Sequence, residues 1–180
     1  MTINELQESL IKEIERITQD MELINRKGEH AELKGYQHAI PFFSVIPDGA
    51  DSDGSLLLED DSANGGGSTE DEMDLFPYFV TRVDSVDYQD DGGQAKVLLL
   101  FAVYDDDPDM RGYYSLTAVM ERVISRFRHE NVLGAFWCER KISMAFQDDD
   151  TYPQFFGAME MIWHLPDISM EPLPEGFLDE

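Results

Sequence analysis

The chain is short of positive charge. Its 180 residues contain 13 Lys and Arg against 38 Asp and Glu, which gives a formal net charge of −25 at pH 7. A protein that binds nucleic acid by neutralising phosphates needs an excess of Lys and Arg, so direct DNA binding is not expected. The content of 42% hydrophobic and 11% aromatic residues is nevertheless that of a folded protein, so the acidity does not predict disorder of the whole chain.

Cysteine and long apolar runs are also scarce. Cys138 is the single cysteine, which excludes an internal disulfide, and its neighbours give no reason for a lowered thiol pKa. No run approaches the ~18 apolar residues of a membrane span, and the N-terminus has early Glu residues where a signal peptide has basic residues and an apolar stretch. We therefore expect an inert structural thiol in a soluble, cytosolic, single domain spanning residues 1–180.

Motifs that carry catalysis are missing. The sequence has no GxSxG, no Walker loop and no dinucleotide fingerprint, and Gly65-Gly66-Gly67 precedes acids where a phosphate-binding loop would precede a helix. The histidines share no spacing that resembles a zinc pair. They are His30, His38, His129 and His164. We expect no enzymatic activity and no cofactor.

Two acidic stretches are candidates for metal-binding loops. An EF-hand that starts at Asp51 fails because Leu56 stands where the loop requires glycine and Ser62 where it requires glutamate. The acids at 105–109 precede a predicted helix, and the helix dipole favours acids there. We expect a turn at 105–109 and no metal, with weak binding of a hard cation as the alternative.

Two amphipathic helices are predicted. Leu6, Leu10 and Ile14 recur at helical spacing in the first helix, and Thr2 and Glu5 are placed to form a capping box at its start. The second helix follows the acidic turn and has one apolar stripe. This stripe consists of Leu116, Met120, Val123 and Phe127.

Extended segments surround the second helix. Residues 35–47 contain two prolines and predict a weak edge strand or connector. Residues 76–89 and 94–104 predict one hairpin, and residues 138–147 and 155–166 predict another. The segment 94–104 is apolar on both pleat faces, so we expect it to be central and covered on both sides by helices or a neighbouring subunit. The expected fold is α+β, a mostly antiparallel sheet of two hairpins and an edge strand with two helices packed on it.

A long acidic insertion interrupts this pattern at about 48–74. It contains ten carboxylates and no Lys or Arg, and its Gly- and Ser-rich composition is that of flexible chain. Its acids are Asp48, Asp51, Asp53, Glu59, Asp60, Asp61, Glu70, Asp71, Glu72 and Asp74. The prolines and acids at about 167–180 predict a C-terminal arm.

The few cations gather in the second helix and the strand after it. They are Arg111, Arg122, Arg126, Arg128, Arg140 and Lys141. A strongly acidic chain with one comparatively basic element can make head-to-tail contacts between copies, and such contacts close into a ring if the rotation permits. The alternative is a solvated helix face with local salt bridges.

Three stretches together resemble a known family. They are the aromatic-proline opening of "FPYFVTRVDSV", the acidic turn feeding a helix in "DDDPDMRGYYSLTAVMERVISRF", and the Tyr-Pro, aromatic-Gly and Trp-x-x-Pro elements of "YPQFFGAMEMIWHLP". In their order and spacing, from about Phe76 to Pro166, they are similar to minor tail proteins of long-tailed bacteriophages and prophages, in particular tail terminator (tail completion) proteins.

This resemblance implies a structural role without catalysis. The subunit would form a hexameric ring on the last tail-tube ring, stop tube polymerisation and join the tail to the head connector, in a virion assembled in the host cytoplasm. The six cations would serve the subunit interface. The ten acids of the insertion would face the lumen or a partner, where carboxylates repel DNA that passes without specific binding. No membrane is involved.

Three other functions stay open from the sequence. One is a different neck or connector protein. Another is an acidic DNA mimic that inhibits a nucleic-acid-binding enzyme, although mimicry requires carboxylates at fixed spacing on rigid elements. The third is a weak calcium-binding module.

Overall fold

A computed structural model of the chain describes residues 2–40, 75–89, 92–109, 111–148 and 151–167. Over these residues, two helices pack on a seven-stranded mixed sheet, which confirms the α+β fold class. The acidic insertion predicted at 48–74 lies outside the described residues. The predicted C-terminal arm also lies outside them, apart from Asp167.

The first helix, α1, spans Ile3–Thr18. It begins where expected, because the Thr2 hydroxyl accepts from the Glu5 N–H and the Glu5 carboxylate accepts from the Thr2 N–H. These two bonds satisfy backbone donors that a helix start leaves without partners. The helix buries Leu6, Leu10 and Ile14 completely, as their spacing predicts.

The second helix, α2, spans Gly112–His129 and also follows its predicted apolar stripe. Leu116, Met120, Val123 and Phe127 are each fully buried. Basic residues occupy its last turn, where the helix dipole favours positive charge. The helix has no side-chain cap at its start.

The sheet has the order β1-β2-β3-β7-β5-β4, and β6 pairs beside β5 on the outer edge of β7. Its strands are β1 Lys34–Gln37, β2 Tyr78–Gln89, β3 Gly92–Tyr104, β4 Val132–Leu133, β5 Phe136–Cys138, β6 Ser143–Phe146 and β7 Gln154–Leu165. β1 runs parallel to β2, and the other pairs are antiparallel. β3 is central, as the apolar character of both its faces predicts.

The segment predicted as one strand at 138–147 is divided in two. β5 pairs Cys138 with Trp163, and β6 pairs Ser143 with Glu160. The chain therefore advances five residues on the β5–β6 side where β7 advances three. The excess cannot stay in register, so the segment between the strands leaves the ladder.

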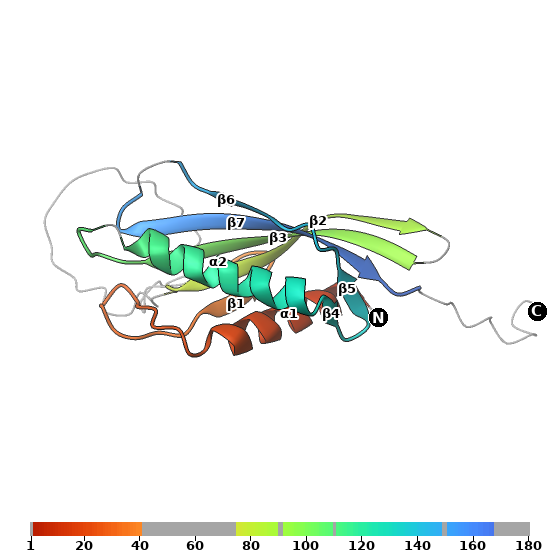
Figure 1. The fold of residues 1–180 in the computed structure, drawn as a ribbon, viewed down its shortest axis with the longest axis horizontal. Helices are drawn as coiled ribbons and strands as arrows, with labels where there is room; N and C mark the ends of the chain where they lie inside the picture. Colours follow the sequence, from red (N-terminus) through yellow and green to blue (C-terminus); the bar gives the residue numbers. More distant parts are fainter. Residues whose placement is uncertain (1, 41–74, 90–91, 110, 149–150, 168–180) are drawn as a thin grey trace, which may run out of the picture.

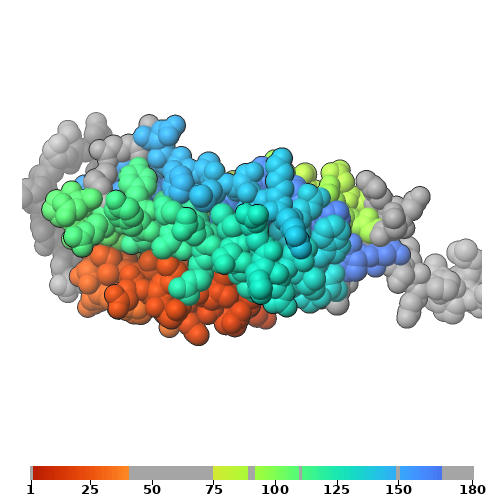
Figure 2. Space-filling view, viewed as in Figure 1, coloured from red at the N-terminus to blue at the C-terminus, as the bar shows by residue number. Residues whose placement is uncertain are grey.

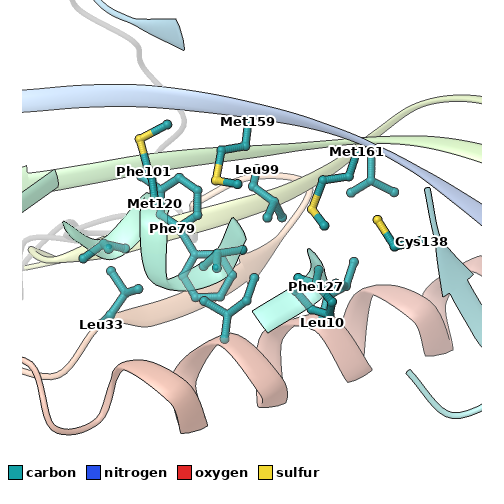
Figure 3. Packing of buried hydrophobic residues seen from close by; sticks show 14 of the residues in the cluster. Leu10, Leu33, Phe79, Leu99, Phe101, Met120, Phe127, Cys138, Met159 and Met161 are labelled. Carbon is teal, nitrogen blue, oxygen red and sulfur yellow. The ribbon is translucent and has the colours of Figure 1, made fainter. Parts of the chain in front are cut away.

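Both helices lie on the same side of the sheet, antiparallel to each other (Figure 1). α1 packs on β1 and β2, and α2 packs on β3 and β7. The core between them contains Leu99, Phe101, Met159 and Met161 from the sheet, whose side chains point toward the helices (Figure 3). Burying such side chains stabilises the fold by roughly 1.5–3 kcal/mol each.

Candidate assembly surface

The sheet face opposite the helices has an apolar part around Leu100, bordered by Lys96, which pairs with Glu160 at 2.9 Å and Asp84 at 3.5 Å. Because side chains alternate across a strand, the residues of β3 between the core residues Val97, Leu99, Phe101 and Val103 point away from the core. They are Leu98, Leu100 and Ala102. Leu98 and Leu100 keep part of their surface exposed, and no described helix lies over them. We call this side of the sheet the helix-free face.

A groove of about 370 Å³ opens at this face near the edge of the sheet. Ala145 of β6 and Ala158 of β7 are directly paired across the ladder, and Leu100 pairs with Ala158 from the other side. Two alanines in one row leave a depression between larger neighbours. Phe146 and Phe156 also line the groove. It is an open apolar surface with no charged residue among its lining residues.

Aromatic rings extend the helix-free face at the start of β2. The Phe76 ring lies 5.2 Å from Tyr78, 6.1 Å from Tyr104 and 6.5 Å from Phe156 in edge-on contacts. The Arg26 guanidinium lies over the Phe76 ring at 5.0 Å. Burial among these groups raises the pKa of the Tyr78 phenol. The cluster therefore excludes water at one end of the helix-free face.

Two of the predicted interface cations hold the helices of one chain together. Arg122 donates to the Asp20 carboxylate at 2.8 Å and to the Ile17 carbonyl oxygen at 3.0 Å. Arg126 is paired with Glu13 of α1, and its side chain is only 18% exposed. The structure thus places both side chains in contacts between α1 and α2.

The Glu13 carboxylate is the centre of this contact. Nε and Nη2 of Arg16 each donate to this carboxylate at 2.8 Å. The Arg16 hydrogen bonds, with a further contribution from Arg126, lower the pKa of Glu13 below its usual value, and partial burial opposes them. With an exposed fraction of 11%, this carboxylate is shielded enough for its pair with Arg126 of α2 to stabilise the helix packing, while Arg16 orients it from within α1.

The other four cations divide by position. Arg111 pairs with Asp107 at 3.3 Å and Asp109 at 3.5 Å in the turn before α2. Arg128, Arg140 and Lys141 are exposed and have no ion pair with any residue that the structure describes. These three, at the end of α2 and between β5 and β6, are the cations available to a partner.

An exposed tryptophan stands at the opposite end of the helix-free face from the Phe76 cluster. Trp137 of β5 is 45% exposed and stacks on His164 of β7, with ring centroids 3.6 Å apart and planes 1° apart. His164 lies 3.1 Å from Glu139, which also accepts from Gln94 at 3.0 Å. His164 therefore has partners on two sides, the Trp137 ring and the Glu139 carboxylate. Trp137 itself was not predicted as an exposed group.

The acids at 105–109 form turns in the described part of the chain. Asp105 accepts from the Asp107 N–H, and Asp107 accepts from the Asp109 N–H, both at 2.9 Å. Among the described residues, no cluster of three or more His, Cys, Asp or Glu is placed to hold a metal ion. In the same residues no helix is long and apolar enough to cross a membrane.

Cys138 is fully buried in the core. Burial, with a smaller effect of Glu139, raises the pKa of its thiol to about 12. The thiol is therefore protonated near neutral pH, which makes it a poor nucleophile. This agrees with its interpretation as a structural residue.

The predicted acids of residues 48–74 lie outside the described residues, so the structure places none of them. An exposed feature that sequence reasoning missed is the edge of β6, whose four residues are all exposed. Its signal was present in the run of uncharged residues between Arg140-Lys141 and Asp148. Neither the protein-family models nor the curated proteins contain a match to this chain.

Proposed function

We propose that this chain is a structural subunit that forms a ring at the head-proximal end of a bacteriophage or prophage tail, ends tube polymerisation and joins the tail to the head connector. The family resemblance supplies the tail terminator role. The observation that supports self-association is the partly exposed, apolar part of the helix-free face around Leu100 and its groove. This proposal includes the two hairpins as the sheet framework of a terminator-like domain and the acidic insertion as its lumen- or partner-facing loop.

The helix-free face fits an assembly subunit for a physical reason. A strand that is apolar on both faces is normally covered on both. Here Leu100 is partly exposed, and the groove that it lines is apolar. Large apolar patches on soluble proteins mark interaction sites, because covering them removes apolar surface from water.

The test combines imaging with a matched pair of variants. Leu100→Asp puts a carboxylate on the helix-free face, and Tyr114→Asp puts one on the exposed side of α2, where Tyr114 is 76% exposed. We expect light scattering at rising concentration to show rings for the parent chain and Tyr114→Asp but not for Leu100→Asp. Circular dichroism checks that all three fold.

Particle images supply the second half of the test. Density for the chain is expected at the head-proximal end of the tail, and tails without the protein should have irregular lengths. Absence of the chain from purified particles, together with monomers at every concentration, would remove the proposal. Inhibition of a nuclease by an equimolar dose would favour the DNA mimic in its place.

A further inference from the structure

The outer edge of β6 is an open strand edge. β6 pairs with β7 on one side, and no described residue pairs with its other side. All four of its residues are exposed, including Met144 at 41% and Phe146 at 37%. In Figures 1 and 2 this segment follows the upper rim of the molecule. Proteins usually protect such edges with charges, prolines or a covering element, and β6 contains none of the first two.

The β1 edge, at the other side of the sheet, is covered by a helix, unlike the β6 edge in the part of the chain that the structure describes. In β1, Lys34 donates its N–H to Pro77 of the neighbouring chain segment, so the N–H of Gly35 points away from the sheet. That N–H donates to the Glu15 carboxylate of α1 at 3.0 Å. The helix therefore occupies the β1 edge, while no described element does the same for β6.

The backbone of β6 fixes which groups a partner would meet. The Gln147 N–H donates to the Phe156 carbonyl oxygen at 3.1 Å, so residue 147 points its hydrogen-bonding groups toward β7. Along an antiparallel strand, the N–H and C=O groups of successive residues point alternately toward one neighbouring strand and toward the other. Met144 and Phe146 therefore present their N–H and C=O groups outward, toward a new strand.

The charges that flank β6 are complementary to those of a second β6 segment that runs in the antiparallel direction. Arg140 and Lys141 precede an uncharged run from Ile142 to Gln147, and Asp148 follows it. A second copy in the antiparallel direction places its acid beside the cations of the first. A parallel copy places cations beside cations. Opposite charges across paired strands are favourable and like charges are not.

We propose that two copies of this chain pair through their β6 edges, antiparallel, about a twofold axis at Met144. In this register Ile142, just before β6, lies beside Phe146 of the partner subunit, and the cations that precede β6 lie at the same end of the pair as Asp148 of the partner subunit. Met144 meets its own counterpart. A shift by two residues instead puts Ile142 against Asp148 of the partner subunit, or Phe146 against Arg140 of the partner subunit, so that an apolar group meets a charge. The pairing is thus determined by the outward backbone groups, the apolar row and the terminal charges together.

This contact is separate from the ring contact and does not rest on the proposed function. A twofold contact uses the same surface on both copies and ends at two, whereas a ring needs two different surfaces. Directly opposed residues of paired strands point to the same side of the sheet. The two helix layers therefore lie on one side of the pair, and the two helix-free faces form one continuous surface on the other.

The charge of −25 on each copy does not prevent the contact. From Arg140 to Gln147 the edge carries two positive and no negative side chains. At physiological ionic strength the screening length is only about 8 Å, so most carboxylates of one copy are screened from those of the other. The pairing should therefore be measured near 0.15 M salt.

The first experiment separates backbone pairing from side-chain contact. Met144→Pro removes an outward N–H but none of the bonds between β6 and β7, because proline is tolerated at an edge whose N–H faces solvent. Met144→Ala removes the same side chain and keeps the N–H. By sedimentation equilibrium, we expect the parent chain to dimerise, Met144→Pro to weaken the dimer at least about tenfold, and Met144→Ala to weaken it much less.

The second experiment exchanges the charges that flank β6. It tests the pairing even if Met144→Pro does not fold. Arg140→Asp and Asp148→Arg each bring like charges together and should weaken the dimer roughly tenfold, while the double exchange restores opposite charges and the dimer. A monomeric parent chain, or a double exchange that is no better than the single changes, would overturn the proposal. Leu100→Asp should still dimerise, so failure of the ring and failure of this pair are distinguishable.

Discussion

Adding one methyl group at Gly112 tests the packing between α2 and the sheet. A Cβ on Gly112 would lie 2.1 Å from two ring carbons of Phe155, where unstrained carbon contacts are about 3.5–4.0 Å. Phe155 is 2% exposed, and its ring is held by Tyr113 at a centroid distance of 4.8 Å. The ring therefore has to move by more than an ångström into occupied space.

Two effects of Gly112→Ala oppose each other. Alanine favours a helix over glycine by about 1 kcal/mol. Overpacking of a dense core costs about 1–3 kcal/mol and more when the neighbours cannot yield. Because the overlap here involves an aromatic ring with contacts of its own, overpacking should win. We expect a net loss of about 1–2 kcal/mol in the free energy of unfolding.

Urea denaturation at one protein concentration, followed by tryptophan fluorescence, measures this loss. Ser125→Ala on the exposed side of the same helix is the matched control and should be neutral or slightly stabilising. The double variant Gly112→Ala/Phe155→Leu should recover part of the loss caused by the methyl group, relative to Phe155→Leu alone. A Gly112→Ala chain as stable as the parent would refute the packing argument.

Three further outcomes follow from the same contacts. The hydrogen bonds of Arg16, with a smaller contribution from Arg126, lower the pKa of Glu13 in the folded chain. The ionised Glu13 therefore stabilises the fold above the unfolded-state pKa of about 4.3, and this stabilisation is lost as the pH falls through the pKa of the folded state. Glu13→Gln should therefore be less stable than the parent by roughly 1 kcal/mol at pH 7, with a smaller difference at pH 3, both read from urea midpoints. A thiol reagent at pH 8 should leave Cys138 unmodified in the folded chain and modify it fully in urea, since burial raises its pKa to about 12. Acrylamide should quench Trp137, which is 45% exposed, but not the fully buried Trp163, and Trp137→Phe should abolish most of the quenching.

The helices show how much local pattern can predict. The spacing of Leu6, Leu10 and Ile14 and the Thr2–Glu5 box lie within a few turns of one helix, so neighbouring residues are enough to define α1. The two-sided apolar character of β3 likewise predicts its central place. The division of 138–147 into β5 and β6 was not predictable, because it depends on the residue spacing along β7.

The partners of the α2 arginines could not be predicted from local pattern. From sequence, Arg122 and Arg126 resemble the other cations of α2. Their partners, Asp20 and Glu13, are 102 and 113 residues away, so only the packing of α1 against α2 assigns them to contacts within one chain.

The amino-acid sequence by itself determined the two amphipathic helices, the α+β class and the central place of β3, because these depend on periodicity among near neighbours. The tertiary structure alone decided which sheet face the helices leave uncovered, which arginines are already paired and which strand edge lacks a partner. These properties depend on register and docking between segments distant in sequence, and a linear pattern does not specify either.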